Sequence, residues 1–318
     1  MCSSDLDAGT YRVMASNDGG VVLSVTATLT VAPALPDLSG LKSGLRLHLK
    51  LDGDLQDVSG HGLNASPVGG PSFVTGRIGQ AFSYSSRKDG SAFRYATFGD
   101  SVKFGDSVSF TVSFWARIDA ATGDPAFIGN KDWGSRGTVG WVIAGDEDLR
   151  LVWNMRNPNG PRQSYDGPPG TLTLHDWHHL VVAFDRAGVA RAYVDGVLAD
   201  DQAALSLTPA GPLDVDGLAL NIGQDGTGKY TDHGQVEGDG AIDDLAIWDR
   251  VLNAREVAAI YTQGAAGRSF DDPMVIPPVR GVRAELEGGG LRLTWTGGKG
   301  PFQVWHARSD RKSTRLNS

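Results

Sequence analysis

Short alternating runs of apolar and polar residues, separated by glycine-rich turns, run through this chain of 318 residues. Residues 176–201, DWHHLVVAFDRAGVARAYVDGVLADD, show the pattern most fully: a polar corner, two strands with apolar positions such as Val181 and Ala183, and a turn. Asp195-Gly196 favours a two-residue type I′ turn, because glycine adopts positive φ freely and aspartate tolerates it. This stretch therefore predicts a β-hairpin.

The same alternation predicts strands elsewhere, and one helix. Residues 45–51, LRLHLKL, form a strand pattern, and residues 241–264 contain a strand followed by a single short helical pattern. Asn253 can cap this helix, Glu256 lies three residues on as in a capping box, and Gly264 can end it. The pattern as a whole indicates an all-β protein with one helix near the end of its main domain.

Composition supports this class and excludes others. The 43 glycines fall between the short apolar runs, as in a protein with many turns. No apolar run is long enough to span a bilayer. The formal net charge of −8, without a stripe of Lys and Arg, argues against a nucleic-acid partner. Cys2 is the only cysteine, so no disulfide can form within the chain.

Two stretches together resemble a known family. The Trp-His-His corner, hydrophobic strand and Tyr-Val-Asp-Gly turn within residues 176–201, and the strand-Asp-Asp-strand and helix of residues 241–264, resemble laminin G-like domains of the concanavalin A-like family. The resemblance implies a two-sheet antiparallel jelly-roll sandwich with one short C-terminal helix over residues 43–267. Such domains mostly bind glycans or proteins, and a minority of the superfold catalyses.

The flanking segments resemble pieces of other β-sandwiches. The Asp-x-Gly-x-Tyr run before Val13 resembles the tyrosine corner at the end of an immunoglobulin domain, with Val13 in place of the second cysteine. The placement of Trp295 resembles the first strands of a fibronectin type III domain. The expected order is an immunoglobulin-like C-terminal fragment at 7–32, a linker at 33–42, the laminin G-like domain at 43–267, a linker at 268–278 and a fibronectin-like N-terminal fragment at 279–308.

Both ends of the chain have a foreign composition. Residues 1–6, MCSSDL, and 309–318, SDRKSTRLNS, resemble translated sequencing-adapter read-through and are expected to be non-native. We therefore expect an internal fragment: a monomeric module of a longer secreted or cell-surface protein, of bacterial type. The lack of disulfides does not oppose this location, because a large sandwich buries enough surface to fold without them.

A loop after the first strand of the main domain contains many oxygen ligands. Residues 52–64, DGDLQDVSGHGLN, differ from an EF-hand, but the Asp-x-Ser-Gly-x-Gly run within them resembles a calcium loop of laminin G-like relatives. The resemblance implies Asp57, Asn64 and Asp243 as side-chain ligands of a structural Ca²⁺. The alternative is a solvated turn, because Asp, Ser and Gly are also ordinary turn residues.

The segment at residues 127–157 contains the candidate ligand site. Trp133 lies in a polar loop, and an aromatic face beside polar groups is how proteins hold sugar rings. The alternative is that Trp133 folds onto the edge of the sheet; Trp141 and Trp153 lie in apolar strand patterns and are expected in the core. The candidate ligand-binding residues are Lys131, Asp132, Trp133, Arg136, Asn154, Arg156, Tyr165, Tyr230 and His233.

These observations favour a non-catalytic module that binds a carbohydrate or a protein, in an adhesive or accessory role. The acidic clusters at residues 145–151 and 237–244 lack the spacing of the paired carboxylates of jelly-roll glucanases, and no Gly-x-Ser-x-Gly elbow is present. No catalytic residue is assigned. Two alternatives stay open, a jelly-roll polysaccharide hydrolase or lyase and a structural spacer without a ligand.

Overall fold

The structure is a computed structural model with two compact units, Pro36–Asp272 and Met1–Leu35 with Pro273–Ser318. In the second unit only the backbone of short strands is described. In the first, apart from the side chain of Glu237, the described residues are 37–86, 93–135, 137–199, 205–231 and 234–272. No helix in this described part is long and apolar enough to cross a membrane.

The unit formed by the two ends of the chain contains paired strands. Each of its sheets has two strands: β1 (Gly9–Tyr11) with β4 (Ala27–Leu29), β2 (Met14–Asn17) with β3 (Gly20–Leu23), β21 (Arg280–Glu287) with β22 (Gly290–Thr296), and β23 (Trp305–Ala307) with β24 (Ser313–Arg315). Val13 and residues 1–6 lie outside the described residues. The immunoglobulin-like, fibronectin-like and non-native assignments stay predictions.

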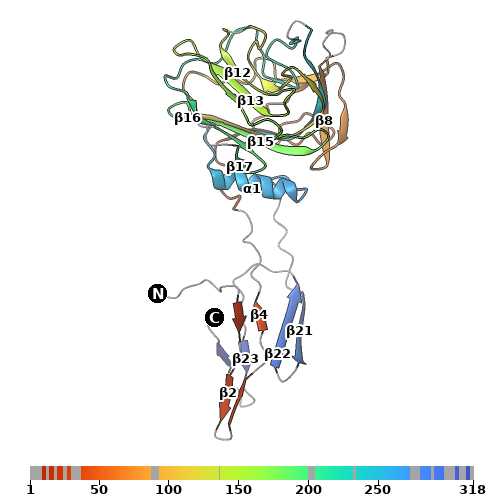
Figure 1. Ribbon diagram of the computed structural model, residues 1–318, viewed down its shortest axis with the longest axis vertical. Coiled ribbons are helices and arrows are strands. Elements are labelled where there is room, and N and C mark those ends of the chain that lie inside the picture. Colours follow the sequence, from red (N-terminus) through yellow and green to blue (C-terminus); the bar gives the residue numbers. More distant parts are fainter. Residues whose placement is uncertain are drawn as a thin grey trace. The chain divides into compact units, whose positions relative to one another are not determined.

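The larger unit is a sandwich of two antiparallel sheets (Figure 1). The first, here called the helix-side sheet, has nine strands, and the second is called the seven-stranded sheet. The helix-side sheet contains, in order, β17 (Val197–Leu198), β16 (Val189–Val194), β15 (Trp177–Phe184), β10 (Phe110–Thr122), β20 (Glu237–Trp248), β8 (Gln80–Ser86) and β7 (Phe73–Thr75), with β18 (Leu205–Ser206) on β16 and β5 (Leu45–Leu49) on β20. The seven-stranded sheet contains, in order, β14 (Gln163–Asp166), β13 (Leu151–Arg156), β12 (Gly140–Gly145), β11 (Ala126–Gly129), β19 (Asn221–Ile222), β9 (Tyr95–Thr97) and β6 (Ser66–Val68).

Aromatic rings from both sheets fill the space between them. Successive side chains of a strand point to opposite faces, so every second residue of each central strand enters the core. Phe110 of β10 lies 5.4 Å from Trp141 of β12, and Phe184 of β15 lies 5.3 Å from Trp153 of β13, measured between ring centroids. Trp141 and Trp153 are both fully buried, which confirms their predicted place in the core.

A single helix, α1 (Ala254–Ala265), covers the other face of the helix-side sheet, below β15 and β17 in Figure 1. Its apolar side, with Val257 and Ile260, packs in a second cluster with Val181 and Trp248. The predicted capping box is present: the Asn253 side chain accepts from the Glu256 N–H at 3.1 Å, and the Glu256 carboxylate accepts from the Asn253 N–H at 2.9 Å.

The end of the helix differs from the prediction. Gly264 does not end it; the helix continues to Ala265, and Gly267 has the positive φ of 72°. Gly264 is needed for another reason, because a Cβ there would lie 2.3 Å from Nε1 of Trp115. A close approach to an indole ring, which a sequence pattern does not reveal, explains this glycine.

The predicted hairpin turn is present. Asp195 and Gly196 have φ values of 51° and 81°, and they join β16 to β17 through the pair Val194–Val197. The Asp195 carboxylate also accepts from the N–H of His179 at 2.9 Å and contacts Nδ1 of His178 at 2.8 Å. The turn is therefore fastened to the polar corner at the start of β15.

The sandwich extends further than predicted at both ends. Segments expected as linkers belong to it: Leu41 is buried, and its carbonyl accepts from Nε1 of Trp248 at 2.7 Å. On the other side, Ser269 Oγ donates to Asp244 at 2.7 Å, and Phe270 packs on Trp248 with ring centroids 5.3 Å apart. Contacts of this kind bring residues 37–42 and 268–272 into the folded unit.

We expect Phe270→Ala to lower the free energy of unfolding by about 3 kcal/mol, the usual cost of a cavity left by a buried aromatic ring. Denaturant unfolding of the full chain, followed by tryptophan fluorescence, measures it. The exposed Val197→Ala serves as control and should change stability by less than about 0.5 kcal/mol. An equally small effect of Phe270→Ala would show that residues 268–272 form a linker and do not belong to the folded unit.

Candidate functional site

One buried carboxylate holds two loops together at an end of the seven-stranded sheet. Asp225, fully buried, accepts from the N–H of Trp133 at 2.9 Å with one oxygen. Its other oxygen accepts from the N–H groups of Thr227 and Gly228 at 2.9 and 3.1 Å. Burial raises the pKa of Asp225, and these donors oppose the rise. The loop after β11 is thereby fixed to the loop after β19.

This junction positions two of the predicted aromatic residues. The rings of Trp133 and Tyr230 meet edge to face, with centroids 6.2 Å apart. Tyr230 is buried and donates from its hydroxyl to Asp124, whereas Trp133 is partly exposed. Nε1 of Trp133 is buried and has no hydrogen-bond partner among the described residues. The Trp133 ring therefore packs on Tyr230, and its role in ligand binding stays a prediction.

The strand register places further predicted residues on one face of the sheet. Val142 pairs with Asn154, which pairs with Ser164, and Gly140 pairs with Arg156. Since Trp153 and Trp141 of the same strands face the core, Asn154 and Arg156 face outward. Lys131 lies at the same end of the sheet as Gly140. A Cβ atom added to Gly140 would lie 3.0 Å from Cα of Lys131.

Lys131 lies beneath the loop that follows it. Its Nζ donates to the carbonyl of Thr138 at 2.8 Å, and the residue is 1% exposed. Burial, with Arg162 and Arg156 nearby, lowers the pKa of Lys131 to about 8. The Arg156 guanidinium donates to the carbonyl of Gly137, so two cations hold the same loop.

The other predicted ligand-binding residues have different surroundings. Tyr165 is buried on the core side, where its ring lies 6.4 Å from that of Trp153, so it cannot join Arg156 on the outer face. Asp132 accepts from the N–H of Ser135 at 3.1 Å within its own loop. Arg136 and His233 lie outside the described residues.

Arg162 and Ser164 were missed by the sequence reasoning, although both lie beside this site. The pair Met155–Gln163 places Arg162 next to Arg156 across the β13–β14 hairpin. Asn154 Nδ2 donates to Ser164 Oγ at 3.0 Å. The Pro-Asn-Gly-Pro turn at residues 158–161 was the available signal, because a hairpin there fixes which residues of its two strands are neighbours.

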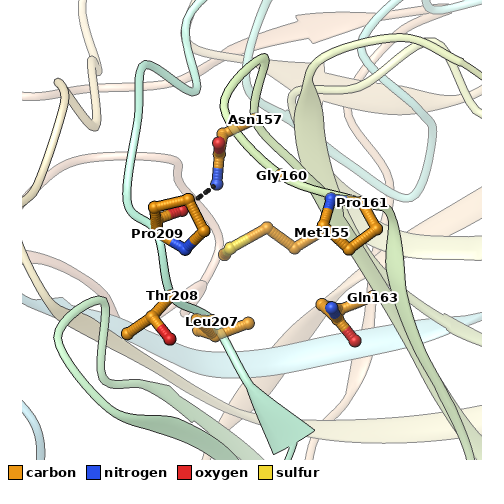
Figure 2. Close-up of a pocket in the computed structure, with 8 residues that line it drawn as sticks. All are labelled: Met155, Asn157, Gly160, Pro161, Gln163, Leu207, Thr208 and Pro209. Atoms are coloured by element: carbon orange, nitrogen blue, oxygen red, sulfur yellow. Dashed lines mark hydrogen bonds between the residues drawn. The ribbon is translucent and has the colours of Figure 1, made fainter.

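A small recess opens on the core side of the same hairpin (Figure 2). Met155 and Gln163 point into it from the two strands, and Asn157 Nδ2 donates to the Pro209 carbonyl at 3.0 Å across its rim. Its volume of about 10 Å³ is about what one water molecule requires. This recess is too small for a sugar ring.

Each of the three predicted calcium ligands accepts hydrogen bonds from backbone N–H groups. The two oxygens of Asp57 accept four hydrogen bonds of 2.9–3.0 Å: from the N–H groups of His48, Ser59 and Leu63 and from the Ser59 hydroxyl. These donors lower the pKa of Asp57 against the effect of burial. A carboxylate has about four lone-pair positions, so none remains for a cation.

Asn64 and Asp243 are the other two predicted calcium ligands. Asn64 Oδ1 accepts from the Asp57 N–H at 2.8 Å, and Asp243 lies apart, with Oδ2 accepting from the Ile78 N–H at 2.8 Å. No group of three metal-binding side chains occurs among the described residues. The shared Ca²⁺ stays a prediction, and Asp57 organises its loop and connects it to β5.

Asp57→Ala should lower the free energy of unfolding by about 2 kcal/mol, because it leaves several buried donors without an acceptor. The loss should be the same in calcium and in chelator. Thermal unfolding in both buffers measures this, with Asp54→Ala in the same loop as control. A stabilisation by calcium that only the Asp57 variant loses would restore the predicted calcium site.

Asp243 is a buried carboxyl group with an unusual environment. It is fully buried, its Oδ1 has no partner among the described residues, and burial together with Asp244 and Asp52 raises its pKa to about 8. The group is therefore neutral at pH 7. Between about pH 4 and pH 8 the folded state binds more protons than the unfolded state, so stability falls as the pH rises through this window.

Asp243→Asn should remove this pH dependence, since the amide stays neutral and keeps an acceptor for Ile78. At pH 9 the thermal midpoint of the variant should exceed that of the original chain by at least about 3 °C, and near pH 4 the two should agree. Thermal unfolding across this range measures the difference. The exposed Asp100→Asn is the control, and parallel curves for Asp243→Asn and the original chain would contradict the assignment.

Comparison with known proteins identifies the family. Residues 89–258 match a laminin G family model described as the concanavalin A-like lectin/glucanases superfamily. The match covers more than half of the chain, which therefore belongs to this superfamily. The predicted family and the predicted jelly-roll sandwich are both confirmed.

Solved structures with the same fold include toxin binding domains. The binding domain of Paraclostridial Mosquitocidal Protein 1 has a TM-score of 0.55 at 17% identity, over 87% of this chain and 68% of that chain. Botulinum neurotoxin type C, whose cell entry depends on interaction with two ganglioside molecules, has a TM-score of 0.54 at 17% identity, over 72% and 53%. The botulinum neurotoxin DC binding domain, in complex with rat synaptotagmin II, has a TM-score of 0.51 at 16% identity, over 70% and 52%.

One curated protein also resembles part of the chain. A Rattus norvegicus protein containing sushi, von Willebrand factor type A, EGF and pentraxin domains is 35% identical over 86 residues, or 26% of this chain. The chain spans 2% of that protein and about half of the two botulinum neurotoxin chains. The likeness to the toxin domains concerns the fold.

Proposed function

We propose that residues 36–272 form a non-catalytic module that binds a glycan as part of a larger secreted or cell-surface protein. The observation that carries this proposal is the loop junction at Asp225, which holds the partly exposed Trp133 at the sheet whose strand β13 carries outward polar residues. A sugar ring needs both features, an aromatic face for its C–H groups and directed partners for its hydroxyls.

Three features support this function. Nε1 of Trp133 and Oδ1 of Asn154 are buried polar atoms without partners among the described residues, so one donor and one acceptor have unsatisfied hydrogen bonds. The Ser164 hydroxyl is exposed on the same face as Asn154. Two of the toxins with this fold interact with gangliosides and with synaptotagmin II, respectively.

The full chain should be retarded in gels that contain one member of a polysaccharide panel, and Trp133→Ala should reduce that retardation at least about tenfold through loss of stacking. Trp177→Ala is the matched control, since Trp177 is also partly exposed but lies on β15 of the other sheet. Thermal midpoints of both variants confirm that they fold.

Three results would contradict the proposal. Equal retardation of the Trp133 and Trp177 variants would show that the loop junction at Asp225 does not take part in glycan binding. Release of new reducing ends or unsaturated products from the retained polysaccharide would assign the chain to the hydrolases or lyases instead. Absence of retardation with every glycan would favour a protein partner or a spacer.

A further inference from the structure

Three cationic side chains gather at the outer end of the β13–β14 hairpin. Met155 and Gln163, paired across these strands, point together into the recess of Figure 2 on the core side. Arg156 is the next residue along β13 and faces the opposite, outer side, and Arg162 lies across from it, directly before β14. Arg162 is exposed, Arg156 is partly exposed and Lys131 is buried. These three residues are here called the cation cluster.

The cation cluster lacks carboxylate partners. Lys131 donates to the Thr138 carbonyl and Arg156 to the Gly137 carbonyl, and among the described residues no ion pair joins either of them, or Arg162, to an acidic side chain. Elsewhere on the same sheet Arg150 is paired with Asp146 at 2.5 Å. The difference is notable in a chain whose net charge is −8.

The arrangement has an electrostatic cost in the free protein. Like charges on neighbouring strands repel each other, and burial of Lys131 weakens the screening by water. Arg162 and Arg156 both act to lower the pKa of Lys131, so the three charges are close enough to interact. The Asp132 carboxylate acts in the opposite direction and is the smallest of the effects on that pKa. An anion bound between the guanidinium groups would relieve this repulsion.

A second observation indicates that the anion belongs to a hydroxylated ligand. Asn154, 1% exposed and two residues before Arg156 on the same face, keeps Oδ1 without a partner among the described residues. Its Nδ2 already donates to the exposed Ser164 hydroxyl. A buried acceptor without a donor is costly, and a ligand hydroxyl would supply that donor. A simple inorganic anion offers none.

We propose that the cation cluster and Asn154 form a subsite for an acidic sugar, a hydroxylated ring that bears a carboxylate or a sulfate group. The guanidinium groups of Arg156 and Arg162 bind the anionic group, Lys131 strengthens the local positive potential, and Asn154 accepts from a ring hydroxyl. This inference rests on the proposed glycan-binding function and names the class of glycan.

The test is affinity electrophoresis of the full chain in three polymers: unsulfated chondroitin, which carries carboxylates, dextran sulfate, and neutral dextran. We expect retardation by at least one anionic polymer and none by dextran. Arg162→Gln and Arg156→Gln should each weaken that binding about tenfold, and added salt should weaken it further. Arg162 is exposed, so its replacement leaves the fold intact.

The control is Arg255→Gln, which removes the same charge from the exposed face of α1. If Arg162→Gln, Arg156→Gln and Arg255→Gln all weaken the retardation by the same factor, the binding is nonspecific charge attraction and the subsite is overturned. Binding confined to neutral glycans would overturn the subsite while leaving the glycan-binding function in place. Failure to bind any of the three polymers or any glycan of the wider panel would overturn both. The ratio of chondroitin to dextran sulfate affinity distinguishes the two anionic groups.

Discussion

The packing of aromatic rings between the two sheets is the interaction on which the remaining structure depends. Phe110 and Phe184 of one sheet contact Trp141 and Trp153 of the other, and these rings fix how the layers face each other. Because side chains alternate along a strand, an inward Trp153 requires an outward Asn154. The outer face of the candidate site is thus a direct consequence of how the core is filled.

Buried carboxylates then fix the loops at the ends of these strands. Asp225 joins the loops after β11 and β19, and Asp57 gathers the N–H groups of its own turn. The Asp195 carboxylate likewise connects the β16–β17 turn to the start of β15, because it accepts from the His179 N–H. Each of these carboxylates accepts hydrogen bonds from several protein donors in place of water. These hydrogen bonds offset the free-energy cost of burying the carboxylate. These three carboxylates therefore serve the architecture of the sandwich, whereas the cation cluster has no such carboxylate partner among the described residues.

Local signals made a large part of this fold predictable. The capping box of Asn253, the positive-φ turn at Asp195-Gly196 and the buried Trp141 and Trp153 all follow from short-range chemistry, and all are observed. Tyr165 was placed wrongly beside the other ligand candidates, because the face on which a residue lies depends on strand register. Register is set by contacts between strands, which no single segment reveals. Arg162 was missed for the same reason.

The domain boundary and the calcium ligands depended on contacts between distant parts of the chain. Phe270 is covered by Trp248 and His48, which are distant in sequence, so a Pro-rich composition alone suggested a linker. For Asp57, the sequence showed oxygen atoms in one loop but not the N–H groups that already occupy them. A ligand set can be assigned only when the remaining lone pairs are known.

Serine, histidine and aspartate also meet where residues near the end of the domain contact β5 and β20. Ser269 Oγ donates to Asp244 at 2.7 Å and lies 3.4 Å from Nε2 of His48, and Asp244 contacts that same nitrogen at 2.7 Å. In a nucleophilic triad the acid and the hydroxyl contact different ring nitrogens, so that histidine can take the hydroxyl proton. Here the Asp244 carboxylate itself accepts the hydrogen bond from the Ser269 hydroxyl. The side chains of Ser269, Asp244 and His48 are all buried. These contacts fasten the end of the domain to β5 and β20.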